Sequence, residues 1–505
     1  MQNNAPKNRI RTALLLAGAL FLILPRINTE DNVLFVLSPW IWQTCFLFYS
    51  RTIRKKREWL LFGFVFLTAV EIRYLHFLGD SEAYYNIVSI LLLIVLALAM
   101  FLPFLLDRVF LMYSRGPFVL LAFPAMRIAI ERFIIGQQFN LALSQFGNKW
   151  LIQSVAVLGD VFITFMVAFV PSVLIWVLLH RDDRKIIRTG RIVLAACALV
   201  FVLGGIRYHT APDPHDPVLM AYASGPQKTY YEDPSEEDPD YNENAAYLRK
   251  TASEAAANGA RLMAYAEEAF MVTGDERDRL LNEAMDLAKE NDLFILICLD
   301  TEDEDGNYKN EAVFIDSEGQ QLSEYAKTNL IPVIEDEYVA GDGVIPSNYV
   351  TIDGVDRVIS YTVCYDATFS KYLLTMDEKT DLFINPSWDW DEIDDLNYRM
   401  QGISAIAGGV VLFKPTVDGW SIVSDPFGRV TYKENTLRMD YDQVYYTSVP
   451  GARADTLYAE IYKILTPLWT IFVVVILAEA LRILITRIRA RRTRKASAAS
   501  STQDP

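Results

Sequence analysis

The chain has 505 residues, 52% of them hydrophobic, and a formal net charge of −16. Its length would allow two or three domains, but its apolar residues gather in separate long runs. A uniformly soluble protein is therefore excluded. A purely membrane-embedded protein is also excluded, because the stretch between Arg207 and Tyr462 is ordinary soluble sequence.

Eight apolar runs predict membrane-spanning helices, seven before the soluble stretch and one after it. A helix needs about 20 mostly apolar residues to cross a bilayer core, and several of the runs reach that length with their flanking aromatic residues. The runs are Ala13–Leu24, Val33–Tyr49, Leu60–Leu75, Ile87–Leu106, Phe118–Ile130, Val157–Leu179, Ile192–Ile206 and Leu465–Ile485.

Lysine and arginine mark the cytoplasmic side of the predicted spans. They cluster before the first run, after the second, between the fourth and fifth, between the sixth and seventh, and after the last. The positive-inside bias then places both termini in the cytoplasm and the soluble stretch outside. The basic C-terminal tail is explained by this topology, so no nucleic acid partner is expected.

The predicted organisation has four parts. Residues 1–207 form a seven-span domain, residues 208–459 an extracytoplasmic catalytic domain, residues 460–488 the last transmembrane helix, and residues 489–505 a basic cytoplasmic tail. The basic start and short first run also fit a signal peptide, but no small-residue cleavage site precedes Pro25. We therefore expect an uncleaved first span.

The soluble stretch alternates helices with strands that are apolar on both faces. Residues 208–241 are rich in Pro, Asp, Glu and Tyr, and we expect a linker or an exposed flap there. Helices are predicted at 242–258, 276–289 and 398–407, and strands at 261–266, 293–299, 312–315, 358–363, 382–385 and 410–413. This pattern indicates a layered α/β domain whose sheets are covered.

Four cysteines are too few for an extracellular disulfide framework. Cys45 and Cys197 lie in predicted spans, and Cys298 lies in a strand where a buried thiol is expected. Cys364 remains, at the exit of the strand 358–363. On its own it is either a nucleophile or another small buried side chain.

A nucleophilic Cys364 would require an activating group. The usual partner is histidine, but the four histidines of the chain, at positions 76, 180, 209 and 215, all lie outside the α/β core. A carboxylate base and a nearby cation are the remaining means. Glu267 ends the strand 261–266, and Lys327 stands before a short apolar segment. Each taken alone also fits an ordinary surface charge.

Together, Glu267, Lys327 and Cys364 resemble, in that order, the catalytic set of the nitrilase (carbon–nitrogen hydrolase) superfamily. This resemblance implies an α-β-β-α sandwich. The surrounding spans make the chain similar to the apolipoprotein N-acyltransferase family. Phe123-Pro124-Ala125-Met126 leading to Glu131, Ser144-Gln145-Phe146-Gly147, and Val363-Cys364-Tyr365-Asp366 carry that likeness.

Three segments depart from the family pattern. Ala266 stands where proline is usual, and Asn385-Pro386-Ser387-Trp388-Asp389-Trp390 matches a family motif only in part. After Lys327, spacing selects Glu335 as the supporting acid, whereas the following Tyr-Val selects Glu337.

The resemblance implies a ping-pong acyl transfer. Glu267 takes the proton of Cys364, which accepts an acyl chain from a phospholipid as a thioester. The chain then passes to the N-terminal amine of diacylglyceryl-modified lipoproteins. Lys327 and the backbone N–H of Tyr365 would stabilise the oxyanion. Glu335 or Glu337 would support Lys327, and Asp366 stands where the family has an acid.

Several interpretations stay open. Trp388 and Trp390 either contact acyl chains or pack in an ordinary way, and Arg127 with Glu131 form either a structural ion pair or a substrate contact. The main alternative function is a membrane-tethered amidase that hydrolyses a small carbon–nitrogen substrate. A catalytically inactive scaffold is a third reading, against which the intact set argues. The family implies a bacterial plasma (inner) membrane. No metal cluster or glycine-rich phosphate loop is apparent, so no cofactor is expected.

Overall fold

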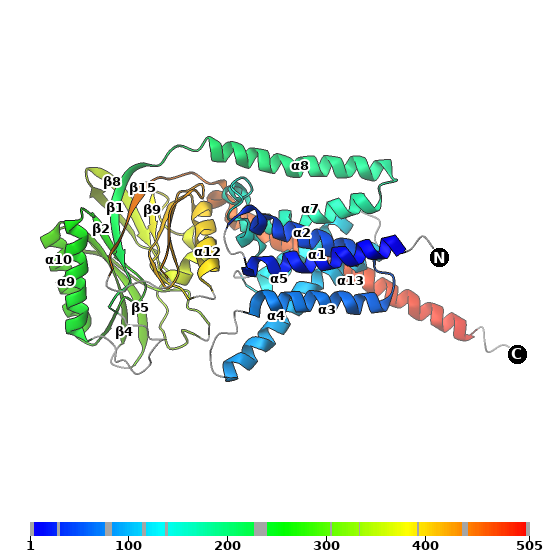
Figure 1. Ribbon diagram of the computed structural model, residues 1–505, viewed down its shortest axis with the longest axis horizontal. Helices are drawn as coiled ribbons and strands as arrows, with labels where there is room; N and C mark the ends of the chain where they lie inside the picture. The colour runs from blue at the N-terminus through cyan, green and yellow to red at the C-terminus, as the bar shows by residue number, and fades with distance from the viewer. Residues whose placement is uncertain are drawn as a thin grey trace. The chain divides into compact units, whose positions relative to one another are not determined.

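The computed structural model describes residues 5–27, 31–75, 83–113, 118–136, 140–226, 240–302, 306–332, 334–390, 393–436 and 443–500. The chain forms two compact units (Figure 1). The first comprises Met1–Ser154, Leu158–Ile206 and Ile461–Pro505, and the second comprises Val155–Val157 and Arg207–Glu460.

Each of the eight apolar runs lies almost entirely in one helix of the first unit. Short helical turns, η3 (Leu141–Gln145), η4 (Ile152–Ser154) and α6 (Val155–Leu158), join two of them. The main helices are α1 (Ala5–Ile27), α2 (Val33–Thr52), α3 (Lys56–Tyr74), α4 (Ala83–Tyr113), α5 (Phe118–Phe133), α7 (Asp160–Leu179), α8 (Arg184–His209) and α13 (Leu457–Ser500).

Within the described residues, six helical segments are long and apolar enough to cross a membrane. They are Asn8–Arg26, Val33–Thr52, Ile90–Leu111, Asp160–Leu179, Arg184–His209 and Leu457–Ala490. Of the two other runs, α5 has only 16 residues, and α3 carries charged side chains in its first and last turns. Membrane association is thus supported, while the number of spans and their sidedness stay predictions.

Charged side chains inside the helical unit are paired. Arg51 donates two hydrogen bonds to Asp107, at 2.8 and 2.9 Å, and also contacts Ser172. Arg127 forms an ion pair with Glu131 at 2.7 Å, one helical turn away, and Glu131 also accepts from Thr164. Charge is costly at membrane depth, and this pairing offsets part of the cost.

The second unit is built on two large mixed sheets. The seven-stranded sheet has the order β15-β1-β2-β4-β5-β6, with β3 also paired to β4. Its strands are β1 (His215–Ala223), β2 (Leu262–Tyr265), β3 (Phe270–Thr273), β4 (Phe294–Glu302), β5 (Tyr308–Ile315), β6 (Gln321–Ala326) and β15 (Tyr445–Gly451).

The six-stranded sheet has the order β14-β13-β11-β9-β8-β7. The strands of this sheet are β7 (Ser347–Ile352), β8 (Val355–Tyr361), β9 (Leu382–Ile384), β11 (Val411–Lys414), β13 (Trp420–Ser424) and β14 (Val430–Asn435). A separate two-stranded sheet pairs β10 (Ser387–Trp388) with β12 (Thr416–Val417).

Helices cover the outer faces of the two sheets (Figure 1). The helices α9 (Tyr241–Ala257) and α10 (Glu276–Asn291) bury their apolar sides on the seven-stranded sheet. The helix α12 (Asp394–Gly408) packs on β11 and β13 of the other sheet. A second core, which includes Leu296, Phe314, Ile359 and Phe413, lies between the sheets. The unit is therefore an α-β-β-α sandwich, as the resemblance to the nitrilase superfamily implied, and it agrees with the layered α/β domain predicted from the sequence pattern.

One expectation was wrong. The segment 208–241 is not simply a linker, because β1 lies inside the seven-stranded sheet, between β15 and β2. Its apolar residues Val218–Ala223 are almost all buried, but polar residues flank this short run and conceal it in the sequence. Residues 227–239 of that segment lie outside the described residues. The other predicted helices and strands of this unit are confirmed within a few residues.

Candidate active site

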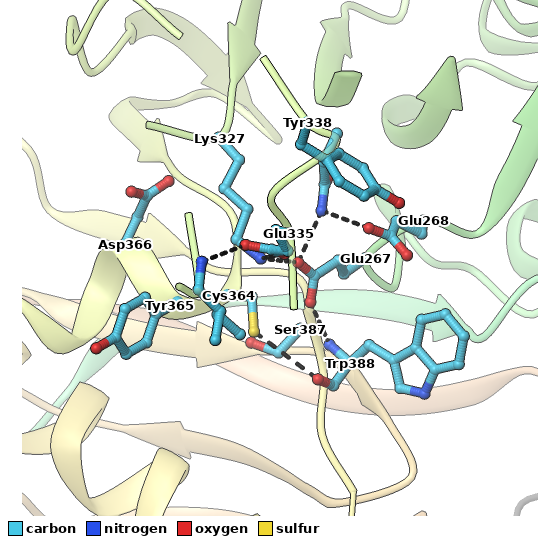
Figure 2. A network of polar contacts seen from close by, with 12 residues as sticks. Glu267, Glu268, Lys327, Glu335, Tyr338, Cys364, Tyr365, Asp366, Ser387 and Trp388 are labelled. Carbon is cyan, nitrogen blue, oxygen red and sulfur yellow. Dashed lines mark hydrogen bonds and ion pairs between the residues drawn. The ribbon is translucent and has the colours of Figure 1, made fainter. Parts of the chain in front are cut away.

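Strand ends of both sheets deliver the three predicted catalytic side chains to one place (Figure 2). Glu267 follows β2 and Lys327 follows β6, both in the seven-stranded sheet. Cys364 begins η5 (Cys364–Thr368), shortly after β8 in the six-stranded sheet. The side chains converge because the two sheets pack face to face.

Lys327 is buried between two carboxylates. Its Nζ lies 2.7 Å from Glu267 Oε1 and also donates to Glu335 Oε1. Burial opposes its charge, but the carboxylate of Glu267, followed by the Cys364 sulfur and Glu335, raises the pKa of Lys327. The site therefore favours the ammonium form of Lys327.

The Glu267 carboxylate is held by donors on both oxygens. Oε1 accepts from Lys327 and, at 2.8 Å, from Asn310 Nδ2, while Oε2 accepts from the backbone N–H of Trp388 at 2.7 Å. These contacts fix its orientation. After burial, the charge of Glu267 is the largest influence on the pKa of the Cys364 thiol, so its carboxylate is the candidate proton acceptor for the sulfur.

Cys364 adopts a backbone conformation that is rare for a non-glycine residue, with φ of 44°. Its N–H donates to Pro386 O at 2.8 Å, and its carbonyl accepts from Asn385 Nδ2 at 3.0 Å and Gln401 Nε2 at 3.3 Å. Burial, and then the charge of Glu267, raises the pKa of the thiol, although Lys327 lowers it. The resting form is therefore the thiol, which requires a base.

The structure distinguishes the two candidate supporting acids. Glu335 is buried, contacts Lys327 and accepts from the backbone N–H of Ile331 at 2.6 Å. Burial raises the pKa of Glu335, and Lys327 opposes that shift. Glu337 is exposed, so only Glu335 is placed to support the lysine.

Asp366 is buried in η5 and joins that turn to the segment after β6. It accepts from Tyr325 Oη at 2.6 Å, from the backbone N–H of Thr328 at 3.1 Å and from that of Asn329 at 2.6 Å. Burial raises the pKa of Asp366. Its carboxylate holds the lysine and cysteine loops together.

The aromatic candidates differ in their relation to the site. Trp388 contributes through its backbone, and its indole Nε1 donates to Asp418 Oδ2 at 3.0 Å. Trp390 is half-buried, and its carbonyl accepts from the N–H groups of Ile393 and Asp394 where α12 begins. The ring of Tyr365 packs edge-on against Phe369, with centroids 4.9 Å apart.

Sequence reasoning missed the amide side chains around the triad. Asn310, Asn397 and Gln401 all lie within the site, and a buried pair of Asp389 and Lys414 lies beside them. Asn397 and Gln401 are four residues apart, so they share one face of a helix. That spacing was the signal in the sequence. It points to the active site only when the structure shows that α12 lies next to the Cys364 sulfur.

Three carboxylates, those of Glu267, Glu268 and Glu335, lie close enough together to hold a metal ion. Lys327 contacts two of them and already supplies a positive charge there. Burial, and then the charge of Glu267, raises the pKa of Glu268, which favours its neutral form. The donor set therefore fits a buried lysine better than a resident divalent ion.

Residues 227–401 match the family model for carbon-nitrogen hydrolases. This part of the chain is therefore similar to carbon–nitrogen hydrolases, and the unit that contains it is called the hydrolase domain below. The matched range contains Glu267, Lys327 and Cys364. The hydrolase domain together with the apolar helical unit gives the two-part fold expected from the sequence.

Solved structures similar to the hydrolase domain include an amidase from Nesterenkonia sp., with 17% identity, a TM-score of 0.40, and coverage of 49% of this chain and 95% of that one. A cysteine-to-alanine mutant of the strain AN1 amidase in complex with butyramide has 18% identity, a TM-score of 0.40, and coverage of 49% and 96%. A glutamate-to-glutamine mutant, with the acetamide moiety of fluoroacetamide added at its active-site cysteine, has 18% identity, a TM-score of 0.40, and coverage of 49% and 95%. None of the curated proteins compared with the chain matches it.

Proposed function

We propose that this protein is an N-acyltransferase of lipoprotein maturation. It would move an acyl chain from a membrane phospholipid to the N-terminal amine of a diacylglyceryl-modified cysteine. The supporting observation is the buried Glu267–Lys327 pair beside Cys364, in a chain that also contains six helical segments able to cross a membrane. The proposed location is a bacterial plasma membrane, with the hydrolase domain on the extracytoplasmic side.

In the first half-reaction, Glu267 takes the proton from Cys364 Sγ as the sulfur attacks the ester carbonyl carbon of the phospholipid. A carbon–sulfur bond forms, and the carbon–oxygen bond of the ester then breaks. The proton passes from Glu267 to the departing oxygen, so the lysophospholipid leaves as an alcohol. Glu267 is the proposed base because its carboxylate belongs to the polar network around Cys364 and acts strongly on the thiol.

The tetrahedral intermediate carries negative charge on the former carbonyl oxygen. The Lys327 ammonium and the backbone N–H of Tyr365 are the proposed donors to that oxygen. Preorganised donors of this kind are typically worth roughly 10²–10³ in rate each. Lys327 suits the role because the two carboxylates hold it in place before any substrate binds.

In the second half-reaction, the lipoprotein amine attacks the thioester. A carbon–nitrogen bond forms, the carbon–sulfur bond breaks, and the amine proton passes through Glu267 to the cysteine sulfur. A thioester must be protected from water between the two steps. Cys364 is only 2% exposed, which supports a long-lived intermediate.

The rival function is hydrolysis of a small amide, which the family match of the domain favours. The same three residues would then act, with water as the second nucleophile. The apolar helices favour lipid substrates, because a soluble amide requires no anchoring to a membrane.

The deciding experiment is intact-mass analysis of the purified protein after incubation with phospholipid vesicles. We expect an acyl adduct on Cys364 that a diacylglyceryl-cysteine peptide discharges. Cys364→Ala should form no adduct, whereas Cys298→Ala, which alters a buried thiol in the same domain, should form it normally. Absence of the adduct, together with turnover of soluble amides, would replace acyl transfer by hydrolysis.

A further inference from the structure

One face of α12 presents two amide side chains to the nucleophile. Asn397 Nδ2 donates toward Cys364 Sγ at 3.9 Å, and Gln401, one turn further along, donates to the carbonyl of Cys364 at 3.3 Å. Neither residue belongs to the Glu267, Lys327 and Cys364 set. They approach the cysteine from the helix that covers the six-stranded sheet.

The orientation of the Asn397 amide is determined by its neighbours. Its Oδ1 accepts from Gln401 Nε2 at 3.1 Å, so the oxygen is directed along the helix. Its Nδ2 also donates to Asp389 Oδ1. An amide nitrogen has two hydrogens, so one serves Asp389 and the other is directed at the sulfur.

Asp389 is itself held by a buried cation. Its Oδ2 lies 2.6 Å from Lys414 Nζ, and both side chains are fully buried. This ion pair keeps Asp389 in place as an acceptor. The chain of contacts therefore runs from Lys414 through Asp389 and Asn397 to Cys364.

The other groups around the sulfur do not replace this donor. The carbonyl of Trp388, 3.8 Å away, accepts a hydrogen bond from the thiol and offers no proton to a thiolate. The largest charge effects on Cys364 come from Glu267 and Asp389, which disfavour a thiolate, and from Lys327, which favours it. Lys327 is already engaged with two carboxylates.

We propose that Asn397 is a further catalytic residue, whose Nδ2–H stabilises the Cys364 thiolate during attack. Gln401 and the Asp389–Lys414 pair are positioning residues that aim this N–H. In the step itself the proton moves from Sγ to Glu267, the Asn397 hydrogen bond to sulfur strengthens, and no group leaves. The inference rests on Cys364 being the nucleophile of the proposed function, and it holds for any acyl donor.

The test is the pH dependence of Cys364 alkylation by iodoacetamide in the full-length protein, with the adduct located by mass. In Asn397→Ala the rate profile should move to higher pH by roughly one unit, which means about tenfold slower alkylation at a given pH below the thiol pKa. Gln401→Ala should move it in the same direction by less. Cys364→Ala supplies the background from the other thiols.

Ser404→Ala is the matched control on the same helix. Ser404 is also buried, but its hydroxyl bonds with Ser370 Oγ at 3.0 Å and Thr368 O at 3.3 Å, away from the sulfur. Its profile should equal that of the unaltered protein, which separates loss of the donor from general loosening of α12. If Asn397→Ala does not fold, Asn397→Ser and Gln401→Ala decide by the same measurement.

The possible results separate this inference from the proposed function. An acyl adduct on Cys364 combined with an unshifted profile in the folded Asn397 variant would overturn the inference and leave acyl transfer standing. A shifted profile without any acyl adduct from phospholipid would support the inference and remove acyl transfer. An equal shift in Ser404→Ala would also overturn it.

Discussion

At the scale of single residues, the site is an arrangement of buried charges that compensate one another. Lys327 lies between Glu267 and Glu335, and its removal would leave both carboxylates buried without a cation. Such an unpaired charge costs far more than the ion pair contributes. The same cation lowers the pKa of Cys364, so structure and reactivity depend on one side chain.

Lys327→Met should therefore show two effects. The pKa of Cys364 should rise, because the charge that lowers it is gone, so alkylation of the thiol at a given pH should be slower. Acyl transfer should fall by roughly 10²–10³, and the free energy of unfolding by about 3–5 kcal/mol. Alkylation rates and calorimetry measure these changes.

Lys309→Met is the control for that variant. Lys309 is only partly buried, and it forms ion pairs with Glu311 of the same strand, β5, and with Glu324 of β6. It should leave the alkylation profile unchanged. Equal effects of the two substitutions would mean that Lys327 acts only through general stability.

Glu335 and Glu337 offer a second matched pair. Glu335→Gln removes the charge that holds Lys327, so we expect at least a tenfold loss of acyl transfer, equivalent to about 1.4 kcal/mol. Glu337→Gln changes an exposed side chain and should leave the rate unaltered. Steady-state kinetics of both variants would decide, and a larger loss in Glu337→Gln would contradict this assignment.

At the scale of elements, the site depends on contacts between loops that follow different strands. Asp366 in η5 accepts from Tyr325 at the end of β6 and from the two residues after Lys327. Asn385, just after β9, and Gln401 on α12 both bond the carbonyl of Cys364. The strained cysteine is thus held from three directions.

Asp366→Ala should loosen this junction. It leaves several buried donors without an acceptor, each worth about 1–3 kcal/mol, so the melting temperature and acyl transfer should both fall. Asp356→Ala is the control, because Asp356 lies on β8 but is exposed and bonds only Thr351 at the surface among its described contacts. A similar loss of stability in both variants would argue against the junction.

At the scale of the whole molecule, the soluble unit is formed by residues that lie between the seventh and the last apolar run. The helical unit includes segments from both sides of it, up to Ile206 and from Ile461. The distribution of basic residues predicts that the hydrolase domain lies outside the cytoplasm. This location can be tested directly.

A topology reporter inserted between Asp353 and Gly354, in the exposed turn between β7 and β8, should report an extracytoplasmic location. The same reporter fused after Pro505 should report the cytoplasm, because Arg and Lys follow the last span. One candidate span, in α13, lies between the two reporter positions. The expected difference between the reporters therefore does not depend on whether α3 or α5 crosses the membrane. The same compartment for both reporters would overturn the topology.

The sequence by itself indicated a chain with apolar helices and a layered α/β domain, and it singled out the three residues that the fold brings together. Apolar runs, strand patterns and the order of Glu267, Lys327 and Cys364 are local or linear properties, and each is readable along the chain. The strand β1 was not predicted, because its short apolar run is surrounded by proline and acidic residues. A segment of that kind becomes a strand only through its neighbours β2 and β15.

Only the tertiary structure decided which acid supports Lys327 and which amides surround Cys364. Glu335 and Glu337 differ by two positions, and the sequence favoured each on different grounds, whereas the fold buries one and exposes the other. Asn397 reaches the sulfur because α12 packs on the six-stranded sheet. Contacts between residues distant in the chain depend on how the sheets and helices pack together. The periodicity of a single helix or strand does not predict that packing.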